Sequence, residues 1–228
     1  MPSVSEEQLV RLPAGEVELP GNLVVPPGAI GIVVFAHGSG SSRHSRRNRF
    51  VAEELQNRRL GTLLMDLLTV EEERVDEHTA QYRFDVPMLA ARLVHAAAWV
   101  SSMERTRGLP IGYFGASTGA AAALVAAAVA PQNICTIVSR GGRPDLAGSE
   151  LHRVRVPVLL LVGGEDTAVI ELNQRALEKL PGEKRLEIVP GATHLFEEPG
   201  ALEAVASLAG DWFEQWLQGY CQLRPDEG

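Results

Sequence analysis

The sequence has few of the residues that build metal centres, disulfide frameworks or nucleic-acid surfaces. Its 228 residues include 2 cysteines, Cys135 and Cys221, which lie far apart and match no metal-ligand spacing. Basic side chains number 21 against 29 acidic ones, so the formal net charge is −8. An acidic balance of this kind argues against a general nucleic-acid binder. We expect two reduced thiols, no metal and no nucleic-acid partner.

Long hydrophobic runs are also absent from the sequence. No apolar stretch reaches the roughly 18 residues of a membrane span, and residues 1–7 lack the basic segment and apolar stretch of a signal peptide. We therefore expect a cytoplasmic protein without a membrane partner. Hydrophobic residues make up 45% of the chain and charged residues 22%, with no internal repeat. This composition and length predict one domain over residues 1–228, with its core at about 16–218.

Apolar runs alternate along the chain with segments of helical periodicity. Runs typical of buried strands lie at 30–36, 60–68, 109–114, 133–139, 156–162 and 185–189. Helical segments are expected at 48–59, 82–103, 120–130, 168–180 and 199–217. Two short runs, 16–19 and 22–25, predict an edge hairpin that turns at Pro20-Gly21, and the polar stretch after residue 68 predicts a loop. The pattern predicts an α/β fold, with a mainly parallel sheet covered by helices on both faces.

The segment Gly115-Ala116-Ser117-Thr118-Gly119 has the pattern of a nucleophile elbow, because it joins a predicted strand to a predicted helix. The turn must be very sharp, and the two glycines remove side chains that would collide across it. Such a turn exposes the Ser117 hydroxyl beside a helix N-terminus, which favours a developing oxyanion.

A serine nucleophile needs a base and an acid, and both follow in the chain. Asp166 and His194 each come directly after a predicted strand, in the order serine, acid, histidine. Right-handed crossovers would bring these strand ends to one edge of the sheet. Ser117, Asp166 and His194 are therefore the predicted catalytic triad. Glu165 and Asp145 are rival acids. His37, which ends a predicted strand beside a glycine-rich loop, is the rival base, whereas the histidines at 44, 78, 95 and 152 lack a comparable position.

The oxyanion would need two backbone N–H donors. The first expected donor is Thr118, which follows the nucleophile, and the second is Ser39 in the glycine-rich loop after residue 36. We expect His37, at the start of that loop, to hold it by hydrogen bonds rather than to act as the base.

From about Val17 to Leu217 the chain resembles the α/β-hydrolase superfamily, and within it the dienelactone hydrolase-like branch. The resemblance rests on His37-Gly38-Ser39-Gly40, on the elbow, and on the segments at 164–166 and 192–194. It implies a sheet of about eight strands, an acyl-enzyme mechanism and a fairly open site without a separate lid domain. Dienelactone hydrolases use a cysteine nucleophile, whereas position 117 is serine. The dienelactone substrate therefore does not follow, and a general serine esterase fits better.

Arginines follow two of the predicted strand ends. For the cluster at residues 43, 46, 47 and 49 we favour pairing with acidic residues or simple solvation. Arg140 and Arg143 follow a central strand, where they could bind an acidic group of the substrate. The open alternative for this second group, and the favoured one for the first, is simple solvation or pairing with Glu71, Glu72, Glu73, Asp85 or Asp145.

The sequence thus predicts a serine hydrolase that cleaves a small ester, lactone or thioester without a cofactor. Its partner would be a small-molecule substrate, with an anionic one left open by Arg140 and Arg143. Three alternatives use the same residues or fold: an acyltransferase, a cofactor-free peroxidase, and a hydrolase-like binding protein with a vestigial triad.

Overall fold

The computed structural model describes residues 6–132 and 134–223 of the chain. The strands are β1 (Gln8–Ala14), β2 (Val17–Val24), β3 (Gly31–Ala36), β4 (Leu60–Met65), β5 (Ile111–Ala116), β6 (Ile134–Arg140), β7 (Val158–Gly163) and β8 (Lys184–Val189). The helices are α1 (Arg46–Asn57), α2 (Val70–Thr79), α3 (Val86–Ser102), α4 (Thr118–Val129), the 3₁₀ segment η1 (Pro144–Arg153), α5 (Thr167–Lys179) and α6 (Ala201–Leu223).

The strands form one 8-stranded sheet in the order β1-β2-β4-β3-β5-β6-β7-β8. The strands from β4 to β8 in this order are parallel, and β1 and β2 add an antiparallel edge. β3, β4, β5, β6 and β7 are buried along their whole length, because helices cover both faces of a parallel sheet. This confirms the predicted mainly parallel α/β fold.

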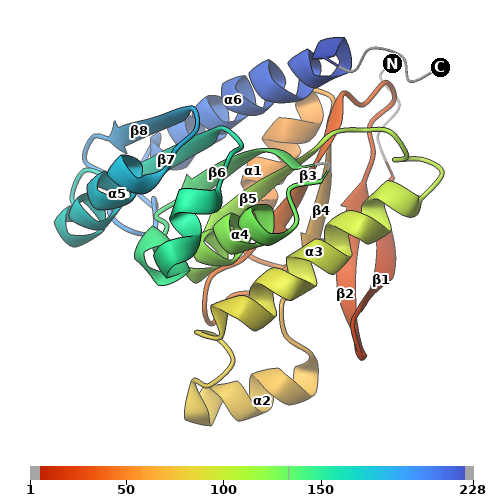
Figure 1. Ribbon diagram of the computed structural model, residues 1–228, viewed down its shortest axis with the longest axis horizontal. Coiled ribbons are helices and arrows are strands. Elements are labelled where there is room, and N and C mark those ends of the chain that lie inside the picture. Colours follow the sequence, from red (N-terminus) through yellow and green to blue (C-terminus); the bar gives the residue numbers. More distant parts are fainter. Residues whose placement is uncertain (1–5, 133, 224–228) are drawn as a thin grey trace.

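The two faces of the sheet carry separate hydrophobic cores. One core joins the sheet to α3, α4 and η1, and the other joins it to α1 and α6 (Figure 1). α4 is alanine-rich and buried almost throughout. Its small side chains allow it to run closely over the sheet, which fixes the start of the helix beside the end of β5.

The predicted edge hairpin was wrong in its position. β1 lies at residues 8–14 and its turn contains Gly15, which has a φ of 75°. Pro20 lies inside β2, at a point where pairing of β2 with β4 has not yet begun, since that register starts at Gly21. A proline is tolerated there because no partner on that side needs its missing N–H.

The predicted polar loop after residue 68 was also wrong, because it contains α2. This helix begins with a capping box in which the Thr69 hydroxyl accepts from the Glu72 N–H and the Glu72 carboxylate accepts from the Thr69 N–H. The next helix, α3, starts at Val86 rather than at residue 82, because Asp85 caps it by accepting from Met88 N–H at 3.0 Å. η1 was not predicted. The start of the strand predicted at 133 lies outside the described residues.

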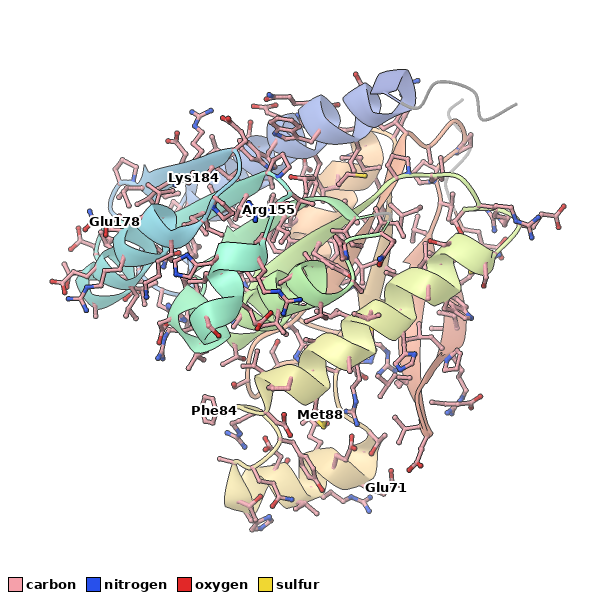
Figure 2. All side chains as sticks on the ribbon, in the orientation of Figure 1. Glu71, Phe84, Met88, Arg155, Glu178 and Lys184 are labelled. Carbon is pink, nitrogen blue, oxygen red and sulfur yellow. The ribbon has the colours of Figure 1, made fainter. Side chains whose placement is uncertain are left out.

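α2 projects from the body of the domain and lies below the N-terminal end of α3 in Figure 1. Two ion pairs join α2 to the residues that follow it in the chain. Arg92 on α3 pairs with Glu72, with 2.6 Å between Nη2 and Oε1, and Arg83 pairs with the buried Asp76, with 2.6 Å between Nε and Oδ2. Figure 2 shows Phe84 and Met88 at the N-terminal end of α3, on the side that faces α2. Among the described residues, no helix combines the length and apolar character needed to cross a bilayer.

Candidate active site

Ser117 occupies a strained backbone conformation between β5 and α4. Its φ is 51° and its ψ is −120°, values that a residue with a side chain adopts only when its surroundings impose them. The surroundings do so through backbone hydrogen bonds. Ser117 N–H donates to Arg140 O at 3.2 Å, and Ser117 O accepts from the N–H groups of Ala120 and Arg143, each at 3.1 Å. The strain is typical of a nucleophile elbow, in which it exposes the hydroxyl.

Both glycines of the elbow are required by close backbone approach. A Cβ atom on Gly115 would lie 2.4 Å from Ala120 Cα, and one on Gly119 would lie 2.3 Å from Ala36 O. Neither contact can be relieved by moving a flexible side chain. The expectation that these glycines avoid collisions across the turn is therefore confirmed.

Asp166 and His194 lie directly after β7 and after β8, and they are hydrogen-bonded. The distance between His194 Nδ1 and Asp166 Oδ2 is 2.6 Å. Asp166 is the N-cap residue of α5, yet its side chain makes no capping hydrogen bond, so the carboxylate faces the imidazole instead. A carboxylate only accepts, so Nδ1 carries a proton and Nε2 remains for acid–base chemistry.

Neither rival acid is hydrogen-bonded to His194 among the residues that the structure describes. Glu165 is exposed, and its backbone N–H donates to Ala192 O at 3.0 Å. Asp145 pairs with Arg143 through two hydrogen bonds of 2.8 and 2.9 Å.

The loop at residues 140–143 contacts both Ser117 and His194. Arg140 and Arg143 hold the backbone of Ser117, while Gly141 between them packs against the imidazole, where an added Cβ would lie 3.4 Å from His194 Cε1. Both Ser117 and His194 are described, and no hydrogen bond joins the serine hydroxyl to the ring in this structure. Such bonds are often long in ligand-free enzymes and shorten when substrate binds.

The two predicted oxyanion donors lie side by side, with a contact that the sequence did not indicate. Ser39 N–H donates to the Thr118 hydroxyl at 3.1 Å, and the two hydroxyls are 3.0 Å apart. Thr118 is the first residue of α4, so its own N–H has no partner within the helix. For the Ser39 N–H to donate to an oxyanion, it must first give up its hydrogen bond to the Thr118 hydroxyl.

His37 holds the loop after β3, as the sequence predicts. Its Nε2 accepts from Leu67 N–H at 3.0 Å, so Nδ1 is protonated and donates to Gly38 O at 2.9 Å. Burial lowers the pKa of His37 below its ordinary value of 6.5, against weaker opposing effects of the Gly38 carbonyl, Asp66 and Glu73. The neutral ring therefore fixes the loop that carries Ser39.

This arrangement makes stability depend on pH. The unfolded chain binds a proton at His37 near pH 6.5, whereas the folded chain does so only at lower pH, so stability is full above 6.5 and falls as the pH drops below it. We expect His37→Gln to reduce the loss of unfolding free energy between pH 7.5 and 5.5, measured by urea denaturation. His152→Gln, at an exposed position, should leave that loss unchanged. An equal loss in wild type and His37→Gln would refute this role of the ring.

Four of the six arginines pair with acidic side chains, whereas Arg46 is exposed and has no ion pair among the described residues. Arg43, Arg47 and Arg49 pair with Asp66, Glu197 and Glu7, which fits the favoured interpretation although the partners differ from those expected. Arg143 pairs with Asp145 through both oxygens of the carboxylate, as in the alternative left open for it.

Arg140 is enclosed in the interior on the α1 side of β6. It is 8% exposed, its Nη2 lies 3.4 Å from Asn48 Oδ1, and its guanidinium lies 5.9 Å from the centre of the Phe196 ring. Burial, with a smaller effect of nearby Arg47, lowers the pKa of Arg140 to about 10. Arg140 Nε and Nη1 are buried and have no hydrogen-bond partner among the described residues, so substrate binding by Arg140 and Arg143 stays a prediction. They serve the site through their backbones, which hold Ser117.

Comparisons with known proteins bear on the family and the fold of the chain. The sequence profile of the dienelactone hydrolase family matches residues 23–220. A crystal structure of a dienelactone hydrolase from Anabaena variabilis is 58% identical, with a TM-score of 0.91, and the match covers 93% of this chain and 98% of that one.

More distant solved structures share the fold. Est1E from Butyrivibrio proteoclasticus is 15% identical with a TM-score of 0.76, over 92% of this chain and 98% of its own. An esterase from Pyrococcus furiosus is 19% identical with a TM-score of 0.75, over 93% of this chain and 92% of its own. The sheet and its helices are thus those of the α/β-hydrolase fold.

Curated relatives come from two strains of Mycobacterium tuberculosis, and each is named "Putative phosphoribosyl transferase". They are 56% identical over 218 residues, which is 96% of this chain and 48% of theirs. The chain therefore spans about half the length of the curated relatives it matches.

Proposed function

The chain belongs to the dienelactone hydrolase family, and we propose that it is a serine hydrolase that cleaves a small ester, lactone or thioester through an acyl-enzyme. The observation that carries the proposal is the 2.6 Å hydrogen bond between His194 and Asp166 at the same sheet edge as the strained Ser117. A backbone conformation of this kind is costly, and it persists where it serves to expose a reactive group.

In the proposed reaction, His194 Nε2 takes the proton of the Ser117 hydroxyl, and the serine oxygen attacks the substrate carbonyl. Asp166 keeps the imidazole in the required tautomer and stabilises its charged form. The N–H of Thr118 donates a hydrogen bond to the tetrahedral oxyanion. The Ser39 N–H becomes the second donor when its hydrogen bond to the Thr118 hydroxyl breaks. His194 then protonates the leaving group and activates a water molecule that hydrolyses the acyl-enzyme.

Serine in place of cysteine makes the base indispensable. A thiol is partly ionised near neutral pH, whereas a serine hydroxyl is not and must lose its proton as it attacks. The close His194–Asp166 pair meets this need. We therefore propose a general serine esterase rather than a thiol-dependent dienelactone hydrolase.

Phosphoribosyl transfer is not proposed for this chain. That name belongs to proteins of about twice the length, of which this chain matches 48%. The matched part is the hydrolase fold described above, and it contains Ser117 and His194, which we propose as nucleophile and base.

The proposal is tested with p-nitrophenyl acetate in water enriched in ¹⁸O. We expect enzyme-dependent release of p-nitrophenol and incorporation of one solvent oxygen into the acetate, because water resolves the acyl-enzyme. The rate without protein is the control. Acetyl groups found only on an added alcohol or amine would instead identify an acyltransferase, and no enzyme-dependent release would support the binding-protein alternative.

A further inference from the structure

A pocket of about 120 Å³ lies between the loop that carries Ser39 and the projecting helix α2. Gly38, Ser39 and Thr118 form the wall nearest the nucleophile. This wall touches Ser117 directly, because a Cβ atom on Gly38 would lie 3.0 Å from Ser117 Cβ. A substrate whose carbonyl sits at Ser117 can therefore extend one of its two substituents into this pocket.

The inner part of the pocket is apolar. Leu67, Leu68 and Leu89 line it, and both Leu67 and Leu89 are at most 3% exposed. Apolar walls in so small a volume favour a short alkyl segment over a bulky aromatic group.

Carboxylates also line the pocket, and two of them are neutralised within the protein. Asp66 pairs with Arg43, and Asp76 accepts hydrogen bonds from the Arg83 guanidinium and from two backbone N–H groups. Arg83 is the one basic side chain among the described residues that line this pocket. Since Asp76 binds it, it is not available to an anionic ligand.

Glu73 and Glu77 differ from these paired acids. They lie four residues apart on α2, so both face the pocket from the same side of the helix. Within the described chain, neither carboxylate has an ion-pair partner, whereas Glu72 and Asp76 beside them do. Glu73 is close enough to His37 to oppose the fall in the pKa of that ring. Both glutamates are exposed, so their carboxylates lie at the rim of the pocket.

We propose that this pocket binds a short alkyl group ending in a positively charged ammonium, and that Glu73 and Glu77 select substrates that carry one. The leucines contact the alkyl stem, and the two carboxylates attract the cation at the rim. Anionic substrates are disfavoured, because among the described residues no unpaired arginine or lysine lines the pocket to offset these charges. This inference rests on the proposed ester hydrolysis and names its substrate class.

The test compares kcat/KM for three thioesters of matched size: acetylthiocholine, its uncharged 3,3-dimethylbutyl analogue, and S-acetyl-3-mercaptopropionate. We expect wild type to prefer the cationic ester over the neutral one by about tenfold at low salt, and to cleave the anionic ester least. Glu73→Gln/Glu77→Gln should bring the cationic-to-neutral ratio close to one, chiefly by lowering kcat/KM for the cationic thioester. Glu71→Gln, at the start of the same helix (Figure 2) and outside the pocket lining, is the matched control and should keep the preference.

The failures of the two proposals can be told apart. No cleavage of the neutral ester refutes ester hydrolysis itself. Cleavage of all three esters at equal rates, or a preference that survives Glu73→Gln/Glu77→Gln, refutes only the cation pocket. A preference for the anionic ester that disappears in Arg143→Gln would overturn it in favour of recognition by arginine.

Discussion

Ser117→Ala is expected to lower kcat/KM for p-nitrophenyl acetate by a factor on the order of 10⁴ or more, the loss typical of removing a serine nucleophile. Neither a neighbouring base nor an oxyanion site can replace the attacking oxygen. The fold should persist, because backbone groups hold the elbow: Ser117 N–H and O bond to Arg140, Ala120 and Arg143, and the side chain makes no capping hydrogen bond. Circular dichroism and the thermal midpoint should therefore match wild type closely.

Ser102→Ala provides the matched control for this loss. Ser102 ends α3, and its hydroxyl donates only to Trp99 O on the same helix. Its replacement should leave turnover within about twofold, since it lies far from the elbow in the chain and has no polar contact with it. Turnover by Ser117→Ala within tenfold of wild type would contradict the assignment of the nucleophile.

Asp166→Asn is expected to lower kcat by about 10⁴ with little change in KM, because an amide facing Nδ1 no longer holds the imidazole in the required tautomer. The structure links this loss to chemistry rather than folding. The carboxylate accepts the 2.6 Å hydrogen bond of His194 and does not cap α5, so an isosteric amide leaves the helix start intact. Steady-state kinetics alongside urea unfolding should show lost activity with nearly constant stability.

Glu165→Gln tests whether this effect is specific to position 166. Glu165 is adjacent in sequence and exposed, and only its backbone is held, by donation of its N–H to Ala192 O at 3.0 Å. We expect its activity to stay within about twofold of wild type. Loss of activity in Glu165→Gln or Asp145→Asn, with Asp166→Asn unaffected, would assign the acid to one of the rival positions.

The central sheet was predictable because its strands are buried on both faces. Continuous apolar runs such as 30–36 and 156–162 mark strands of this kind without reference to the rest of the fold. The edge was less predictable. Pro20-Gly21 has the composition of a turn, and only the register of β2 against β4 shows that the proline lies beyond the paired segment.

α2 escaped prediction because its stability does not come from an apolar stripe. Most of its residues are exposed, and it is held by the Thr69–Glu72 capping box and by the charged pairs Glu72–Arg92 and Asp76–Arg83. Both arginines lie beyond the helix in sequence, so periodicity within residues 70–79 carries no sign of them.

The residues proposed as the triad could be selected from the sequence because their places follow from topology. Parallel strands with right-handed crossovers bring residues 117, 166 and 194 to one sheet edge wherever the side chains point. Contacts that depend on side-chain packing could not be foreseen in the same way. The donation of Ser39 N–H to the Thr118 hydroxyl and the burial of Arg140 against Phe196 are examples.

The most direct test of the proposed nucleophile is to react the folded protein with a fluorophosphonate and locate the adduct by mass spectrometry of its peptides. A serine activated by His194 and Asp166 should react once per chain, at Ser117 alone, and the adduct should be absent from Ser117→Ala. Absence of labelling on folded protein, or labelling at another residue that survives Ser117→Ala, would contradict the account.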